Sequence, residues 1–327
     1  MKDITLSRRA LLGGAVAAAL PSIPALAAFP ERPVRWIVAY AAGGGTDTLA
    51  RLVGAEMSRR LGQPVVIENR PGAATNIGAE AAAKSAPDGY TLFTADNGTL
   101  VFNTALFRSL PYDPSRDFRP IGLMARFPLF LVTGQKPVAE TARELAAKAK
   151  AAPASIDYAS PGIGSPHHLA MERLAREAGL RFNHVPYRGA APAVNDLLAG
   201  TVPLMVLDYP SGAEHLRSGR LKALAVLSPA SLDDLPAVPT VQAALGLPDF
   251  EAYAWQGMVV PRATPDALAA QLTKTLDAAL QDEGVRGRMR QIGLEPLGGG
   301  PREFEALWQR EREVWLPLIR DLGITLD

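Results

Sequence analysis

Three consecutive glycines, in the segment AYAAGGGTDTLARLVG at residues 39–54, supply the first candidate for chemistry. They are Gly43, Gly44 and Gly45. They follow an apolar run and precede an amphipathic helical pattern. A strand, a glycine turn and a helix start collect unpaired backbone N–H groups at one point, where the helix dipole attracts an anion. Glycine also lets a ligand approach the backbone closely.

Two polar residues follow the glycines. Thr46 is the expected helix cap. Asp47 is expected to stabilise the first helical turn, or else to shape a loop that holds a ligand carboxylate or to accept from a ligand donor. The dinucleotide fingerprint fails at Thr48, and no lysine completes a phosphate loop. We therefore expect no cofactor here.

A second turn of the same build lies in YASPGIGSPHHLAMERL, residues 158–174. Gly162 and Gly164 precede Ser165, which is predicted to cap a helix or to contact a ligand. His168 follows in the first turn, and we expect it on a polar helix face or at the ligand. Two more strand ends carry Asn97 and Thr99, and Asp208. Ligands of open α/β sheets bind outside the carboxyl ends of strands, so these four ends predict one crevice.

Catalysis and metal binding find little support. The chain has four histidines and no cysteine, and neither H-E-x-x-H nor an aspartate-rich loop occurs, so we expect no metal site. Ser165, His168 and Asp208 occur in the chain order of a hydrolase triad. However, Ser165 and His168 are only three residues apart at one helix start, which suits two groups facing one ligand better than a triad. An exported hydrolase that uses this pair remains the alternative.

Strands and helices alternate along most of the chain, which indicates an α/β fold with parallel sheets. The length of 327 residues favours two lobes, here 28–126 with 255–327, and 127–254. The chain is predicted to cross between them near 124–128 and 250–256. The main expected strands span 34–40, 65–69, 91–95, 129–133, 155–160, 182–186, 204–208, 223–228 and 255–260. The expected helices span 46–61, 76–85, 139–151, 167–178, 190–199, 210–218, 265–281 and 301–322.

The first residues predict export. A charged start, an apolar run from Ala10 to Leu20 and a small-x-small site at Ala25–Ala27 are typical of a signal peptide over 1–27, cleaved near Ala27. Ser7-Arg8-Arg9 leaves the twin-arginine and general export routes open. The net charge of +1 and the absence of long like-charge runs disfavour nucleic acid or an anionic membrane as partners.

The ordered segments AAGGGTDTLAR, VVIENRPGAATNIGAEAAAKSAPDGYTL, YASPGIGSPHHLA and HVPYRGAAPAVNDLLAG resemble the extracytoplasmic solute receptors of the tripartite tricarboxylate transporter family, often called Bug proteins. The resemblance implies a two-lobed type II periplasmic-binding fold, a Venus flytrap, that closes around a small carboxylate. It implies a periplasmic, monomeric receptor that delivers its ligand to an integral membrane permease. It places the ligand at one loop of each lobe and at further strand ends: Gly43, Gly44, Gly45, Thr46 and Asp47; Gly162, Gly164, Ser165 and His168; and Asn97, Thr99 and Asp208.

Ile163 departs from the family pattern, because an asparagine is frequent between the two glycines of the second loop. We therefore expect the distal half of the ligand to be less polar than an amino-dicarboxylate. A further alternative, a ligand-reporting partner of a membrane sensor, uses the same fold and stays open.

Overall fold

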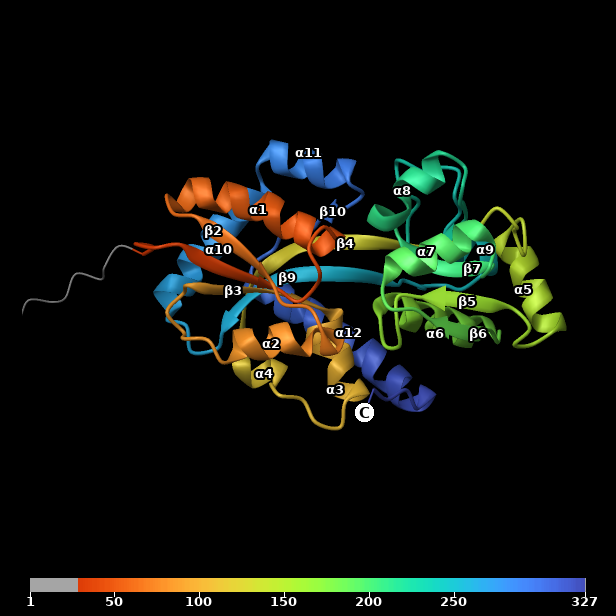
Figure 1. Cartoon of the computed structure of the whole chain (residues 1–327), viewed down its shortest axis with the longest axis horizontal. Helices are drawn as coiled ribbons and strands as arrows, with labels where there is room; N and C mark the ends of the chain where they lie inside the picture. The colour runs from red at the N-terminus through yellow and green to blue at the C-terminus, as the bar shows by residue number, and fades with distance from the viewer. Residues whose placement is uncertain (1–28, 327) are drawn as a thin grey trace, which may run out of the picture.

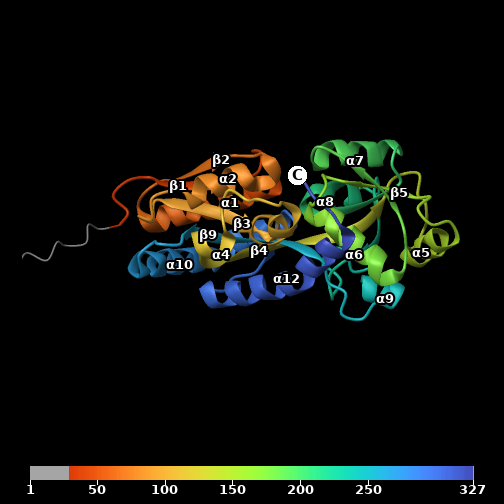
Figure 2. The same cartoon turned by 90° about the horizontal axis from the view of Figure 1, so that it is seen from below.

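The computed structural model describes residues 29–326, so the predicted signal peptide lies outside the described residues. Figures 1 and 2 show an elongated molecule whose helices gather in two groups along one long sheet. The strand order is β2-β1-β3-β9-β4-β7-β5-β6, with β8 and β10 also paired to β4. Within the described range, no helix has the length and apolar character needed to cross a membrane.

Each end of the sheet is a set of parallel strands. The first set comprises β1 (Val34–Val38), β2 (Val65–Asn69) and β3 (Thr91–Asp96), with β1 in the middle. The second comprises β5 (Asp157–Ser160), β6 (Asn183–Pro186) and β7 (Leu204–Asp208). β1 and β7 are mostly apolar, and β1, β3 and β7 are all almost wholly buried, as strands with both faces covered must be.

Long antiparallel strands join the two sets. β4 (Phe118–Thr133) pairs with β9 (Tyr253–Pro261) up to Pro128, and from Leu129 onward it pairs with β7 and β8 (Lys222–Val226). β10 (Glu295–Pro296) pairs with Arg126 and Ala125 of β4. β4 begins eleven residues before the strand expected at 129–133, because two register shifts against β9 accommodate its irregular apolar pattern.

Helices cover both faces of the sheet (Figure 1). α1, α10 and α11 lie on one face of the first set, and α2, α4 and α12 lie on the other. The helix expected from residue 139 begins instead at Ala142, because the Thr141 side chain accepts a hydrogen bond from the Glu144 N–H and caps it. The helices are α1 (Gly45–Leu61), α2 (Asn76–Ala83), α3 (Asn103–Leu106), α4 (Pro114–Asp117), α5 (Ala142–Ala151), α6 (Pro166–Ala178), α7 (Ala190–Ala199), α8 (Tyr209–Arg217), α9 (Val241–Leu245), α10 (Asp266–Leu280), α11 (Glu283–Gln291) and α12 (Pro301–Leu322), with short turns η1 (Ala73–Thr75) and η2 (Gly98–Phe102).

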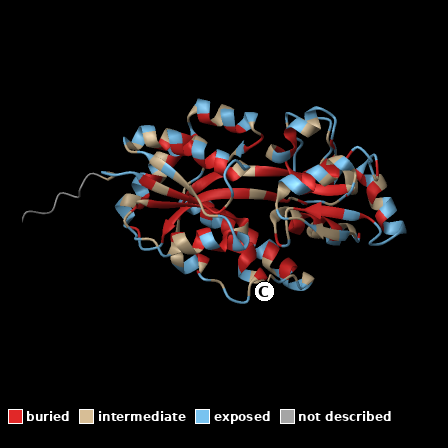
Figure 3. Ribbon diagram, in the orientation of Figure 1, coloured by how far each residue is buried: buried red, intermediate tan, exposed pale blue. Residues whose placement is uncertain are grey.

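The core follows the sheet through the molecule, as the buried strands in Figure 3 show. Beneath α1, the side chains of Leu49, Val53 and Met57 are fully buried, whereas Leu52 is only partly so. On the opposite face one apolar cluster extends from the first group of helices into the second, because α12 contributes to it alongside α6. The two groups therefore share packing as well as strands.

The end of the chain also joins the two groups. After α12, the Leu326 N–H donates to the Leu106 carbonyl at the end of α3, at 2.9 Å. The Leu326 side chain lies beside Gly164 in the loop before α6. The carboxyl-terminal residues thus contact segments of both groups.

Candidate functional site

The glycine turn between β1 and α1 leaves the start of α1 open. Gly43 has a φ of +84°, a value that favours glycine. The expectation that Thr46 caps the helix was wrong, because α1 begins at Gly45 and its N-cap is Gly44, which makes no side-chain capping bond. The first bond of the helix runs from the Thr48 N–H to the Gly44 carbonyl, at 2.9 Å. The preceding N–H groups are those that a helix leaves without internal partners. Gly44 is exposed and Gly45 is partly exposed, whereas Thr46 and Asp47 are buried, so an anion would approach this helix start from the glycines.

Asp47 holds this turn in shape. Its carboxylate accepts from the Gly43 N–H at 2.8 Å, from Arg51 Nε at 2.9 Å and from Asn69 Nδ2 at 2.9 Å. The residue is 2% exposed. Burial alone would raise the pKa of the carboxyl, but these three partners outweigh it and lower the pKa below its ordinary value. Asp47 therefore lies in the first turn of α1 and bonds the loop that precedes it.

The second turn is closed by its own side chains. Ser165 Oγ accepts from the His168 N–H at 3.2 Å and caps α6. Gly164 has a φ of +75°, and a side chain there would collide with Leu106 of α3. Gly162 donates its N–H to Ser160 Oγ at 3.1 Å. The turn is therefore rigid, and the Ser165 hydroxyl proton remains free to meet a ligand.

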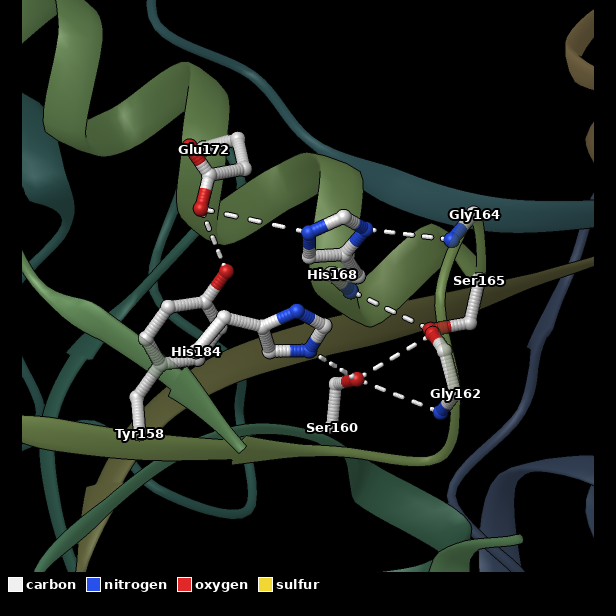
Figure 4. A network of polar contacts seen from close by, with 8 residues as sticks. All are labelled: Tyr158, Ser160, Gly162, Gly164, Ser165, His168, Glu172 and His184. Atoms are coloured by element: carbon white, nitrogen blue, oxygen red, sulfur yellow. Dashed lines mark hydrogen bonds and ion pairs between the residues drawn. The ribbon is translucent and has the colours of Figure 1, made fainter. Parts of the chain in front are cut away.

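The stacked rings of Tyr158, His184 and His168 lie beside this turn (Figure 4). The rings of His168 and His184 are 3.9 Å apart and nearly parallel, and Tyr158 stacks on His184 at 4.8 Å. His168 Nδ1 accepts from the Gly164 N–H at 3.0 Å, which requires that nitrogen to be unprotonated. Burial, together with the neighbouring His184, lowers the pKa of His168 to about 3, and burial lowers that of His184 to about 4.

Ser165 and His168 do not form the hydrolytic pair considered from the sequence. The Ser165 hydroxyl oxygen accepts from the His168 backbone N–H, while the His168 ring nitrogen Nδ1 accepts from the Gly164 N–H. Neither side chain activates the other, so the triad order in the sequence has no counterpart in geometry.

The start of α8 lies beside the start of α6. Asp208 caps α8 by accepting from the Ser211 N–H at 2.9 Å, and it also contacts His167 Nε2 at 2.9 Å. Burial would raise the pKa of Asp208, but the bonds from His167 and Ser211 lower it overall. His167 begins α6, so this contact fixes the starts of α6 and α8 to one another.

The start of α1, in the first group of helices, lies beside the start of α8. A Cβ built on Gly45 would lie 3.8 Å from Pro210 of α8 and 3.0 Å from Phe127 of β4. Through Pro210, Asp208 and His167, the starts of α1, α8 and α6 form one contiguous group. Three helix dipoles thus direct their positive ends toward one region, where they favour a negative charge.

The end of β3 lies at the edge of this region. The Asn97 Nδ2 donates to the Tyr253 carbonyl at 3.0 Å, and the Asn97 residue is fully buried. Thr99 bonds Asp96 through both its N–H and its hydroxyl, each at 2.8 Å, so its side chain fixes the turn. Tyr40 donates to the other oxygen of Asp96. Burial raises the pKa of Asp96 above its ordinary value.

Two features were missed from the sequence. Ala73, Ala74 and Thr75 all have positive φ, and Asn103 Nδ2 holds this loop by donating to the Ala74 carbonyl at 2.8 Å. Such strain is uncommon for residues other than glycine and concentrates at functional sites. The Pro71-Gly72 pair before the loop was the only signal of this loop in the sequence.

The second feature is Gln256, which donates to Thr46 Oγ1 across 210 positions of sequence. No local sequence pattern reveals such a contact.

No cluster of three or more metal-ligating side chains occurs among residues 29–326. A cavity of about 600 Å³ lies between α10 and the Gly299–Pro301 segment, and none of the residues at the starts of α1, α6 and α8 lines it.

These features define a class: a two-lobed α/β binding protein with an anion-attracting region where its lobes meet. The model of the tripartite tricarboxylate transporter family receptor matches residues 49–324, and the chain belongs to this family. It is 36% identical to Protein BugT of Bordetella pertussis over 299 residues, covering 91% of each chain.

Solved structures agree with the family and the fold. The R. palustris protein Rpa4515 with adipate has a TM-score of 0.84 and 33% identity, covering 91% of this chain and 100% of that one. MatC from Rhodopseudomonas palustris with bound malate has a TM-score of 0.80 and 34% identity, covering 89% and 100%. A further structural relative, BugD, is described as a periplasmic binding protein, at 34% identity and a TM-score of 0.80.

Proposed function

We propose that this protein is a periplasmic receptor that captures a small carboxylate between its lobes and delivers it to an integral membrane permease. The observation that carries the proposal is the convergence of the starts of α1, α6 and α8, of which only α1 lacks a side-chain cap. An uncapped helix start with exposed glycines suits a carboxylate, and the relatives with adipate and malate support that class of ligand.

The two lobes in this proposal are 28–126 with 255–327, and 127–254. The change of partner along β4, from β9 to β7, supports this division. Bending of the strands at that change would close the lobes on the ligand, and the ligand would stabilise the closed state by the contacts it adds there.

The proposed contacts come from both lobes. Gly44, Gly45 and Thr46 supply N–H and hydroxyl donors from the first lobe, while the bond from the Gly43 N–H to Asp47 fixes the loop. Ser165 supplies a hydroxyl from the second, while His168 and Asp208 position the helix starts. Ile163 is 44% exposed on the second loop, which supports a ligand whose distal half is apolar. Gly162, Gly164, Asn97 and Thr99 shape the surrounding turns.

Native mass spectrometry of freshly purified mature protein, followed by calorimetry with linear carboxylates, tests the proposal. We expect a bound acid and, for Gly45→Val, loss of binding, because the added side chain meets Phe127 and Pro210 at the start of α1. Gly287→Val is the matched control, since a Cβ at this helical glycine meets nothing within 4 Å. Failure of every carboxylate to bind the wild-type protein would contradict the proposal.

A further inference from the structure

Arg126 of β4 lies at the junction of the two lobes. β4 pairs with β9 as far as Pro128 and with β7 from Leu129 onward. The Arg126 guanidinium lies over the Tyr253 ring, 4.2 Å from its centroid. The side chain is only 22% exposed, and its Nε is buried without a hydrogen-bond partner among the described residues. A cation that has lost part of its hydration in this way needs nearby carboxylates.

Two carboxylates lie within ion-pair distance of Arg126. Its Nη1 is 3.3 Å from Glu251 Oε1 and 3.8 Å from Glu295 Oε2. Hydrogen bonds between a guanidinium and a carboxylate are usually about 2.7–2.9 Å long, so neither carboxylate holds Arg126 tightly. A small movement of either carboxylate therefore changes which of the two Arg126 favours.

Glu295 is held beside Arg126 by the sheet of the first lobe. The two residues are direct cross-strand partners in β10 and β4, so their side chains lie on the same face of the sheet. On its other side Arg126 is paired with Trp255 of β9, whose Nε1 donates to Glu311 of α12 at 2.9 Å. Arg126 and Glu295 therefore stay together whatever angle the lobes take.

Glu251, in contrast, is attached to the second lobe. Its carbonyl accepts from Arg173 Nη1 of α6 at 2.7 Å. The next residue, Ala252, donates its N–H to the Leu227 carbonyl just after β8, at 2.8 Å. A rotation of the second lobe therefore moves the Glu251 carboxylate relative to Arg126.

The lobes touch one another in the described structure. The start of α1 lies against Pro210 of α8. Gly293, which follows α11, packs against the Tyr209 ring of α8, and a side chain on Gly293 would collide with that ring. Contact between the lobes thus coincides with the shorter ion pair, the one between Arg126 and Glu251.

We propose that Arg126 is an electrostatic switch in the hinge: it pairs with Glu251 when the lobes are together and with Glu295 when they separate. This inference rests on the two-lobed receptor of the proposed function and adds a residue that sets its equilibrium. Because Arg126 keeps a carboxylate in both arrangements, neither arrangement leaves it as an unpaired, partly buried charge. A ligand then has less to overcome when it shifts the population toward contact between the lobes.

Spin labels on the two lobes test the switch. The chain contains no cysteine, so Ala55→Cys in α1 and Ser218→Cys just after α8 label two exposed positions without background. Because α1 and α8 meet at their starts, the labels move apart when the lobes separate. Pulsed electron spin resonance of the ligand-free protein measures the populations of short and long distances.

The two carboxylates are expected to act in opposite directions. Glu251→Gln removes the partner used when the lobes are together, so we expect the ratio of long to short distances to rise about two- to fivefold. Glu295→Gln removes the partner used when they separate, so we expect the ratio to fall by a similar factor. In an Arg126→Gln background, neither substitution is expected to change the ratio.

Glu80→Gln provides the matched control. It removes the same charge from an ion pair with Lys84 that lies wholly within the first lobe, and we expect it to leave the distances unchanged. Melting curves establish that each variant folds. If Arg126→Gln does not fold, the two glutamate variants decide the matter alone.

The inference is overturned if Glu251→Gln and Glu295→Gln shift the ratio in the same direction, or if either shifts it no more than Glu80→Gln does. Native mass spectrometry of the wild-type protein separates this outcome from failure of the proposed function. A bound acid with unresponsive lobes would remove only the switch. Opposite shifts in a protein that binds no acid would remove the proposed receptor and leave the switch.

Discussion

Ser165 and Asp47 both lie at helix starts, and both bond to nearby groups in the structure. Ser165 caps α6, and Asp47 bonds the loop that precedes α1. His168 was expected on a polar helix face or at the ligand, but it is 4% exposed and lies behind the loop. Asp47 and His168 thus hold their loops from buried positions, whereas Ser165 is partly exposed.

The neutral state of His168 leads to a pH-dependent stability. The unfolded chain takes up a proton at this residue near pH 6.5, whereas the folded protein does so only near pH 3. Between these values the unfolded state binds more protons, so the free energy of unfolding falls as the pH decreases, by up to about 1.4 kcal/mol per pH unit for this one residue. Urea unfolding at pH 7, 6, 5 and 4 measures the slope.

His168→Asn provides the matched comparison. Its Oδ1 can replace Nδ1 as the acceptor for the Gly164 N–H, but it does not titrate. We expect the variant to fold and to show a shallower slope, with the remaining dependence due partly to His184, whose pKa is also lowered. An identical slope in both proteins would show that His168 is not neutral in the folded state.

Single elements were predictable where a local pattern determined them. The glycine turn, the start of α6 and the apolar stripe of α1 follow from spacing and capping residues. The full extent of β4 did not, because Arg126 and the register shifts against β9 break its pattern. The contacts from His167 to Asp208 and from Gln256 to Thr46 join distant segments, so only the folded chain reveals them.

The stripe of α1 allows a test of element stability. Leu49 is fully buried beneath α1, so Leu49→Ala is expected to lower the free energy of unfolding by about 2–5 kcal/mol. Thr48→Ala, at the exposed neighbouring position, is expected to change it by less than about 0.5 kcal/mol. Chemical denaturation of both variants measures the difference. Equal effects would mean that α1 does not pack on the sheet as described.

The molecule as a whole is joined by two kinds of connection. β4 and β9 run between the strand sets, and α12 carries the apolar cluster across to α6. The side chains of Arg176 and Asp321, from α6 and α12, add an exposed ion pair at 2.8 Å. Closure must therefore bend the strands while α12 keeps its contacts, which favours a small rotation over wide separation.

Ligand binding should then be visible in the shape and stability of the whole protein. At a ligand concentration one hundred times the dissociation constant, we expect about 2.7 kcal/mol of added stability and a smaller radius of gyration. Thermal unfolding and small-angle scattering with and without ligand measure the two effects. Added stability without compaction would indicate that the unliganded protein is already closed.

The contact of Leu326 with Leu106 and Gly164 has a practical consequence for anyone who produces this protein. An affinity tag or fluorescent fusion attached after Asp327 would begin two residues beyond Leu326, whose N–H bonds Leu106 and whose side chain lies beside Gly164. Purification handles and reporter dyes are better placed elsewhere, for instance on the exposed face of α10. Affinities measured with a carboxyl-terminal tag should be repeated after its removal.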